Sequence, residues 1–206
     1  MKLFYSPTSP YARKCRALAI EKGIEDRIQI ITASPMSNPP ELQAANPLGK
    51  VPALLLDNGQ CVVDSPVICA YLDSLLDGPR LIPADPAARI DALTREALAD
   101  GIMDAAFAIV MERKRPEPQR SPEWLERWTS AIRRSVAHLA ARAPDSQWAN
   151  GRQPDIGDIA LACALGYVDF RLGDLAWDKD APALRTWLAT ISSRASFTIT
   201  APPPGA

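Results

Sequence analysis

The pattern of apolar and polar residues changes once along the chain, near residue 80. Before that point, short strand-like runs at residues 2–6, 28–32 and 52–63 alternate with three helical patterns, at residues 10–22, 41–45 and 65–76. The third run is a hairpin, because Asn58-Gly59 between its apolar halves suits a two-residue turn. The pattern therefore predicts the order βαβαββα, with two parallel strands joined through a helix and an antiparallel hairpin closing the sheet.

The second half of the chain has a helical period throughout. Residues 87–115 and 121–141 form two long helical patterns, and Asp155 with Asp158 predicts the N-terminal cap of a third, mostly apolar helix. A Pro- and Gly-bearing stretch separates the two kinds of pattern. We therefore expect an α/β domain, a linker and an all-helical domain, over residues 1–76, 77–86 and 87–206.

Composition and charge restrict the class of partner. The 206 residues are 47% hydrophobic with a formal net charge of −1, so the chain can bury a core and lacks the basic surplus of nucleic-acid or anionic-membrane binders. The four cysteines have no metal-ligand spacing, and the N-terminal segment lacks the apolar core of a signal peptide. We expect a cytoplasmic protein with no metal, no nucleic-acid or membrane partner, and a small neutral or zwitterionic ligand.

The hairpin and the helix after it form a candidate ligand site. A cis Val51-Pro52 peptide would turn the Val51 backbone groups toward an extended, peptide-like ligand. Asp64 and Ser65 precede a helix, with Ser65 expected at the N-cap, and together could bind an amino group and a carboxylate. Lys50 could reach a ligand carboxylate. The ordinary alternatives are a trans proline, a simple helix cap and a solvated lysine.

The loop before residue 10 is a second candidate site. Its sequence Ser9-Pro10-Tyr11-Ala12 resembles the glutaredoxin CPYC motif with both sulfurs replaced, which excludes dithiol redox chemistry at this position. A hydroxyl at a helix N-terminus could donate a hydrogen bond to an anionic ligand sulfur and favour thiolate over thiol. Thr8 is the rival donor, and ordinary N-capping is the alternative role of Ser9.

These features together resemble the cytosolic glutathione transferases, through about residue 197. The chain matches their NPxGKVPxL and (E/D)S motifs, and its SPxxRK loop and ALADGIMDA helix are closest to small bacterial members. The resemblance implies a thioredoxin-like βαβαββα domain, an all-helical bundle domain, a homodimer and glutathione as co-substrate, bound at Ser9, Lys50, Val51, Asp64 and Ser65. Ser9 stands where omega-type members have cysteine, so their thiol-transfer activity is not expected.

The resemblance also implies a reaction and a second-substrate pocket. Bound glutathione thiolate would attack an electrophilic hydrophobic molecule in an apolar pocket, for which the candidates are Tyr11, Phe107, Met111 and Tyr167. Packing in the core is the alternative for these side chains.

Two carboxylates one helical turn apart, Asp100 and Asp104, form a further candidate site. One of them would hold the ligand's ammonium across the dimer, as an acidic residue of this helix does in the family, or both would pair with an intersubunit arginine. Glutathione-dependent peroxide reduction, dehalogenation and non-catalytic binding or scaffolding are further alternatives for the whole protein.

Overall fold

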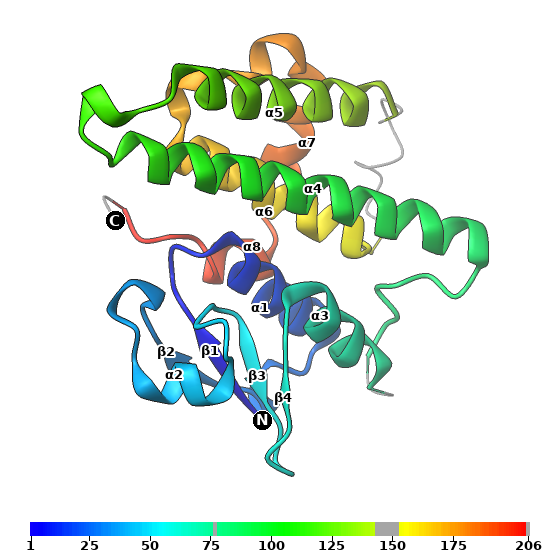
Figure 1. Ribbon diagram of the computed structural model, residues 1–206. Helices are drawn as coiled ribbons and strands as arrows, with labels where there is room; N and C mark the ends of the chain where they lie inside the picture. Colours follow the sequence, from blue (N-terminus) through cyan, green and yellow to red (C-terminus); the bar gives the residue numbers. More distant parts are fainter. Residues whose placement is uncertain (76–77, 143–152, 205–206) are drawn as a thin grey trace. The chain divides into compact units, whose positions relative to one another are not determined.

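The computed structural model describes residues 1–75, 78–142 and 153–204 (Figure 1). Contacts divide the chain into two compact units. The first unit comprises Met1–Ala92 and Arg194–Ala206, and the second comprises Leu93–Ser193. The final segment of the chain therefore belongs with the N-terminal unit, which the hydrophobic pattern does not indicate.

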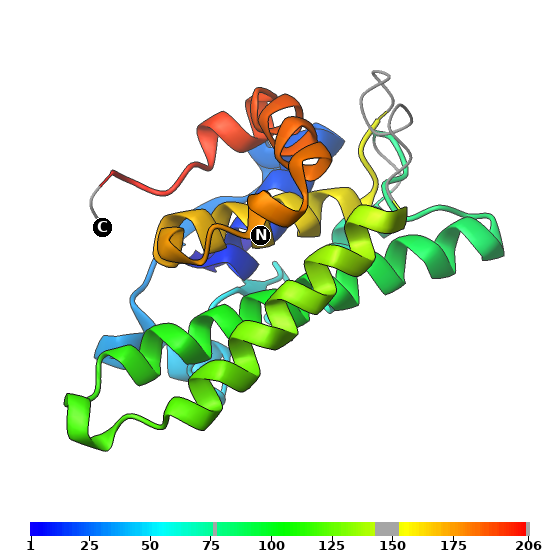
Figure 2. The ribbon, with the colours of Figure 1, turned by 90° about the horizontal axis from the view of Figure 1, so that it is seen from above.

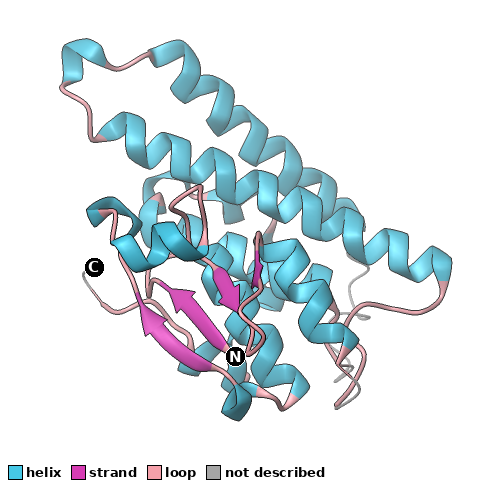
Figure 3. Cartoon of the chain, turned by 60° about the horizontal axis from the view of Figure 1, so that its bottom comes forward, coloured by secondary structure: helices cyan, strands magenta, loops and turns pink. Residues whose placement is uncertain are grey.

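Among the described residues, the first unit holds a four-stranded sheet in the order β2-β1-β3-β4 (Figure 3). Strand β1 pairs with β2 in parallel and with β3 antiparallel, and β3 and β4 form the antiparallel hairpin. The predicted thioredoxin-like fold is confirmed. The strands are β1 (Lys2–Tyr5), β2 (Gln29–Thr32), β3 (Ala53–Leu55) and β4 (Cys61–Val62).

Helices pack on the sheet of the first unit. Helix α1 packs against α3, and the short α2 packs on β3. Phe4 shares an apolar cluster with Leu42 of α2, so α2 covers the face to which Phe4 points, and Leu3 points to the opposite face. Pro10 at the first turn and Gly23 in the left-handed conformation set the ends of α1 as predicted. The helices are α1 (Pro10–Lys22), α2 (Pro40–Ala45) and α3 (Ser65–Ser74).

Two local predictions are wrong. The hairpin has a three-residue loop, because the Leu56 N–H donates to the Gln60 carbonyl at 2.8 Å and only Gly59 of the Asn-Gly pair has a positive φ, 87°. Helix α3 begins at Ser65, and Asp64 occupies the N-cap without a side-chain capping bond. Ser65 is thus a helical residue and not the cap.

The segment after α3 is fixed to the first unit by buried polar contacts. Asp73 accepts hydrogen bonds from the Leu81 and Ile82 N–H groups at 2.7 and 3.2 Å. The Lys22 ammonium, which is 2% exposed, donates to the Pro79 carbonyl at 3.1 Å and lies 3.8 Å from the Asp73 carboxylate. This buried charge pair is hydrogen-bonded on both sides, so the linker is an integral part of the unit.

The C-terminal segment also packs on the first unit, where α8 (Ala195–Ile199) contacts α1. Glu21 of α1 accepts hydrogen bonds from two nitrogens of Arg194 at 2.7 and 2.6 Å and from the Ser196 hydroxyl at 2.6 Å. Burial alone raises the pKa of the Glu21 carboxyl, but these hydrogen bonds and the Arg194 charge outweigh it and lower the pKa below its ordinary value.

The second unit is helical, and α4 and α5 run antiparallel to each other (Figures 1 and 2). Helix α6 is buried along most of its length, as its apolar sequence predicts. Its predicted Asp155–Asp158 capping box is present, and Arg95 of α4 donates to both carboxylates at 2.7 Å. The helices are α4 (Pro86–Arg113), α5 (Pro122–Arg142), α6 (Ile156–Arg171) and α7 (Pro182–Ser192).

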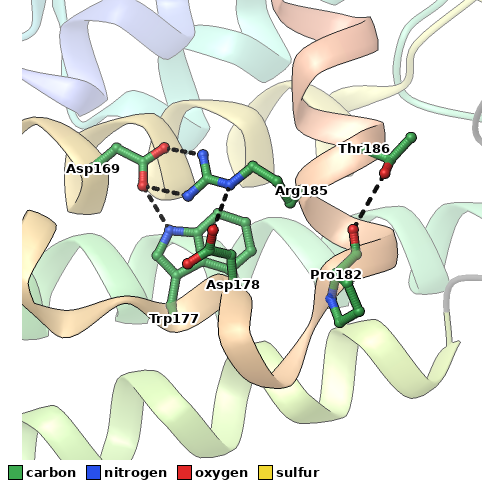
Figure 4. Close-up of polar contacts among 6 residues, drawn as sticks. All are labelled: Asp169, Trp177, Asp178, Pro182, Arg185 and Thr186. Atoms are coloured by element: carbon green, nitrogen blue, oxygen red, sulfur yellow. Dashed lines mark hydrogen bonds and ion pairs between the residues drawn. The ribbon is translucent and has the colours of Figure 1, made fainter.

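A polar network joins α6 to α7 (Figure 4). Asp169 accepts two hydrogen bonds from Arg185, at 2.6 and 2.8 Å, and one from the Trp177 indole at 2.8 Å. The guanidinium also lies 4.4 Å from the centre of the Trp177 ring and donates to Asp178 at 3.1 Å. Its partners are 7 to 16 residues apart, farther than the one-turn spacing of a helix cap or pair.

Short 3₁₀ helices occur in the connections, as η1 (Glu25–Arg27), η2 (Pro35–Ser37), η3 (Glu117–Gln119), η4 (Gly173–Leu175) and η5 (Trp177–Asp180). Within the described parts of the chain, no helix has both the length and the apolar character required to cross a membrane.

We expect Gly78→Ala to destabilise the protein more than Gly23→Ala. Both glycines have a positive φ, so each alanine costs about 1–2 kcal/mol of backbone strain. A Cβ at Gly78 would lie 2.0 Å from the Lys22 carbonyl oxygen, whereas one at Gly23 meets nothing within 4 Å. The linker must then shift, at a further cost of roughly 1–3 kcal/mol. Urea unfolding of the two variants measures the difference, and equal losses would contradict this packing.

We expect the stabilising effect of Arg194 to depend on pH. Because the pKa of Glu21 is lowered in the fold, the ion pair stabilises above the unfolded pKa of about 4.3 and the effect is lost as pH falls through the folded pKa. The unfolding free energies of wild type and Arg194→Gln should therefore differ at pH 7 and converge in acid. Arg16→Gln, which removes a guanidinium that lies over the Tyr5 ring, is the control and should show no such convergence.

Candidate functional site

The register of the sheet brings three loops to one end of the first unit. Phe4 lies opposite Ala53 in an antiparallel pair, so the chain leaving β1 lies beside the chain entering β3. Leu54 lies opposite Val62 in the same sense, so the chain leaving β4 also lies beside the entry to β3. The loop before Ser9, the residues Lys50 and Val51, and the pair Asp64-Ser65 therefore converge.

Ser9 is both the N-cap of α1 and a free donor. Its hydroxyl oxygen accepts a hydrogen bond from the Ala12 N–H at 3.2 Å, which leaves the O–H to donate elsewhere. The side chain is partly exposed. Thr8 is also partly exposed, and its hydroxyl lies 3.4 Å from the Ser6 hydroxyl. Capping and ligand binding are thus compatible at Ser9, and the free O–H lies at the positive end of a 13-residue helix.

Val51 enters the site through its backbone. Its side chain is buried in the cluster with Phe4 and Leu42, and the Val51-Pro52 peptide bond is cis. Within the described residues, no backbone hydrogen bond uses the Val51 N–H or carbonyl. Both groups are therefore available to an extended ligand lying beside the entry to β3.

Asn46 holds the loop that carries Lys50 and Val51. The Asn46 side chain, in a residue only 2% exposed, donates to the Lys50 carbonyl at 2.8 Å and accepts from the Leu48 N–H at 3.0 Å. Gly49 completes the turn with a φ of 63°. The Lys50 side chain is exposed. Sequence reasoning missed this role of Asn46, although Asn before Pro-Leu-Gly is a signal for a side-chain-closed turn.

Ser65 and Asp64 present polar groups at the N-terminus of α3. Ser65 is 2% exposed and is the first helical residue. Asp64 is exposed and does not cap the helix with its carboxylate, and the Val63-Asp64 peptide bond is cis. The Ser65 carbonyl accepts a contact from the buried Cys15 thiol of α1 at 3.7 Å, which ties the two site helices together. Cys15 is thus a core thiol, 0% exposed.

The remaining candidates are divided between the units. Tyr11 lies on α1, while the stripe on α4 comprises Asp100, Asp104, Phe107 and Met111, of which Phe107 is 41% exposed. Tyr167 lies on α6, where burial raises the pKa of its phenol and the charge and hydrogen bond of Arg171 offset only part of that effect. A shared second-substrate pocket and a cross-subunit role for the aspartates stay predictions. Sequence analysis did not predict that Arg171 would be the neighbour of Tyr167.

In the described parts of the chain, no group of three or more His, Cys, Asp or Glu side chains is placed to hold a metal ion. The converging groups are a hydroxyl donor, a free backbone N–H and carbonyl, a carboxylate and an ammonium. This set suits an extended zwitterionic ligand that carries peptide groups.

Comparisons with known proteins find a match to the same family in each of the two units. The family described as "Glutathione S-transferase, N-terminal domain" matches residues 8–75, and "Glutathione S-transferase, C-terminal domain" matches residues 122–190. The Escherichia coli K12 protein named "Uncharacterized GST-like protein YibF" is 38% identical over 203 residues, which cover 98% of this chain and 99% of that protein.

Two solved structures of a glutathione transferase family member from Pseudomonas fluorescens Pf-5 are also similar. Both are 44% identical to this chain and cover 98% of it. The one with bound glutathione has a TM-score of 0.92 and is covered over 98% of its length. The one with bound S-(propanoic acid)-glutathione has a TM-score of 0.88 and is covered over 100%.

We expect Asn46→Asp to destabilise the site loop by about 1–3 kcal/mol, since the carboxylate cannot donate to the Lys50 carbonyl, 2.8 Å away. Asn58→Asp is the matched control, because Asn58 uses only its carbonyl oxygen, as acceptor from the Gln60 N–H. Chemical unfolding at pH 7 measures both variants. A loss at Asn46 no larger than the loss at Asn58 would contradict the structural role of Asn46.

Proposed function

We propose that this chain, which belongs to the glutathione S-transferase family, binds glutathione and activates its thiol for attack on electrophilic hydrophobic small molecules. The convergence of a free Ser9 hydroxyl with the Val51 backbone and the Asp64-Ser65 pair is the observation that carries the proposal. Glutathione bound to a Pseudomonas fluorescens family member that is 44% identical supports the choice of ligand.

Each part of glutathione has a matching group in the first unit. The γ-glutamyl α-amino group would pair with Asp64, and its α-carboxylate would accept from the Ser65 hydroxyl and the free N–H groups at the start of α3. The cysteinyl backbone would hydrogen-bond to the Val51 N–H and carbonyl. The glycine carboxylate would then reach Lys50, which is exposed.

The thiol lies, in this arrangement, at the N-terminus of α1. The Ser9 O–H donates to the sulfur, and the helix dipole adds a favourable potential, so both favour thiolate over thiol. The thiol proton leaves to solvent, and the thiolate forms a bond to the electrophilic carbon, from which the leaving group departs with its bonding electrons. Ser9 acts as a hydrogen-bond donor and is not consumed. Thr8 is the alternative donor to the sulfur.

The second substrate is an electrophile bound next to the sulfur, with Tyr11, Phe107, Met111 and Tyr167 as the candidate lining. S-(propanoic acid)-glutathione in the Pseudomonas fluorescens relative supports this choice, because it is a glutathione substituted on sulfur. We propose that conjugation of this kind is the reaction of this chain.

We also propose that the protein acts as a homodimer. Asp100 and Asp104 are acidic residues one turn apart on α4, and Phe107 on the same stripe is 41% exposed. Burial of this stripe against a second copy would remove the exposed apolar surface from water. One of the aspartates would then approach the ligand ammonium of the partner subunit.

We expect Ser9→Ala to lower kcat/KM roughly 10²-fold while the glutathione Kd changes little, because the lost donor acts mainly on the charged sulfur. Ser65→Ala should instead weaken glutathione binding about tenfold, since it removes a hydrogen bond to a charged group. Turnover with a standard aryl halide and calorimetric titration measure the two effects. Full turnover in Ser9→Ala would assign the sulfur contact to Thr8 or to the backbone.

Titration with glutathione, combined with thiolate absorbance across pH, tests the proposal as a whole. In the complex, thiolate absorbance should appear well below the free thiol pKa of about 8.5, and in Ser9→Ala its onset should move upward. Binding without a lowered thiol pKa would favour the non-catalytic binding or scaffolding function. Absence of binding would exclude both functions.

A further inference from the structure

Arg13 is a charged residue of α1 that the proposed glutathione site does not use. It lies one helical turn after Ser9, on the same helix face, and its backbone N–H donates to the Ser9 carbonyl at 3.0 Å. Side chains on a helix lean toward its N-terminus, so that of Arg13 extends over the turn that carries Ser9. The side chain is partly exposed.

The C-terminal segment holds one edge of the Arg13 guanidinium. Its Nε donates to the Thr200 hydroxyl at 3.3 Å, its Nη2 donates to the Phe197 carbonyl at 3.1 Å, and its Cζ lies 5.6 Å from the Phe197 ring centre. These contacts fix the orientation of the group. They occupy the Nε–Nη2 edge and leave the donors of the Nη1–Nη2 edge for another partner.

The partners of Arg13 are all uncharged, in contrast to those of Arg95, Arg185 and Arg194. Arg95, Arg185 and Arg194 each hold a carboxylate within 2.7 Å. Arg13 has no such carboxylate among the described residues. Its oriented charge is therefore not neutralised, and a free guanidinium edge is suited to two-point binding of a carboxylate.

We propose that Arg13 binds a carboxylate on the electrophilic substrate, so that the preferred acceptors are anionic. This inference rests on the proposed function, in which Ser65 and Lys50 already bind the two carboxylates of glutathione. A thiolate and an anionic acceptor repel each other, and a guanidinium beside both offsets that repulsion in the transition state. Arg13 thus determines substrate specificity and takes no part in proton transfer.

A pair of aryl halides that differ in one charge tests the proposal, namely 4-chloro-3-nitrobenzoate and its uncharged amide. With either acceptor, the glutathione sulfur forms a bond to the ring carbon, chloride leaves with the bonding electrons, and the thiol proton passes to solvent. Wild type should have the higher kcat/KM with the benzoate. Arg13→Gln should lower kcat/KM roughly tenfold for the benzoate and less than twofold for the amide.

Three variants separate substrate recognition from the structural role of Arg13. Arg16→Gln removes a neighbouring positive charge of α1 and should leave the ratio of the two kcat/KM values unchanged. Thr200→Val removes a contact to the C-terminal segment but keeps the guanidinium, so the benzoate preference should persist. Arg13→Lys keeps the charge without the two-point geometry and should restore only part of the preference.

The outcomes distinguish this inference from the proposed function. Equal losses with both acceptors in Arg13→Gln would show that Arg13 only anchors the C-terminal segment. A fall in glutathione affinity, measured by calorimetry, without a change in the acceptor ratio would assign the guanidinium to glutathione itself. Either result overturns the inference and leaves the proposed function standing, whereas wild-type protein that binds no glutathione would overturn the proposed function.

Discussion

The antiparallel register of β3 between β1 and β4 is the constraint on which the candidate site depends. Because both neighbours of β3 run against it, the chain leaves each of them where β3 begins. A slip of one residue would turn Ala53 and Leu54 to the wrong faces and displace Val51 from its apolar cluster. The buried contacts of β3 therefore stabilise the fold and position the binding groups at the same time.

Helix α1 connects the site to the rest of the first unit. Its N-terminus carries Ser9 and, one turn later, Arg13, and at its C-terminus Glu21 and Lys22 bind the C-terminal segment and the linker. The Lys22–Asp73 pair is buried, and an ion pair removed from water is costly to break once formed. In the Arg194–Glu21 pair, the carboxylate side chain is 6% exposed and the arginine side chain is 37% exposed. The helix that carries Ser9 is therefore held at both ends by contacts to other parts of the first unit.

Local sequence signals predicted most helices and strands. Contacts between residues that are far apart in the sequence could not be predicted. Pro10 and Gly23 define the ends of α1, and Asp155 with Asp158 defines the start of α6, because capping acts within one turn. Val51, Asp64 and Ser65 were recognisable from a motif, and the sheet places them together. The Arg194–Glu21 pair joins positions 173 residues apart and has no local pattern. The Asn58-Gly59 pair is compatible with both a two-residue and a three-residue hairpin loop, so it did not determine the length of the loop between β3 and β4.

The return of Arg194–Ala206 to the N-terminal unit has a consequence for biosynthesis. On the ribosome, the strands and α1 emerge first, yet Glu21 and Arg13 receive their partners Ser196 and Phe197 only after the helical residues 93–193 have been synthesised. The thioredoxin-like unit therefore cannot reach its final packing as an independent N-terminal domain. It completes its packing only once the intervening helical residues have been made.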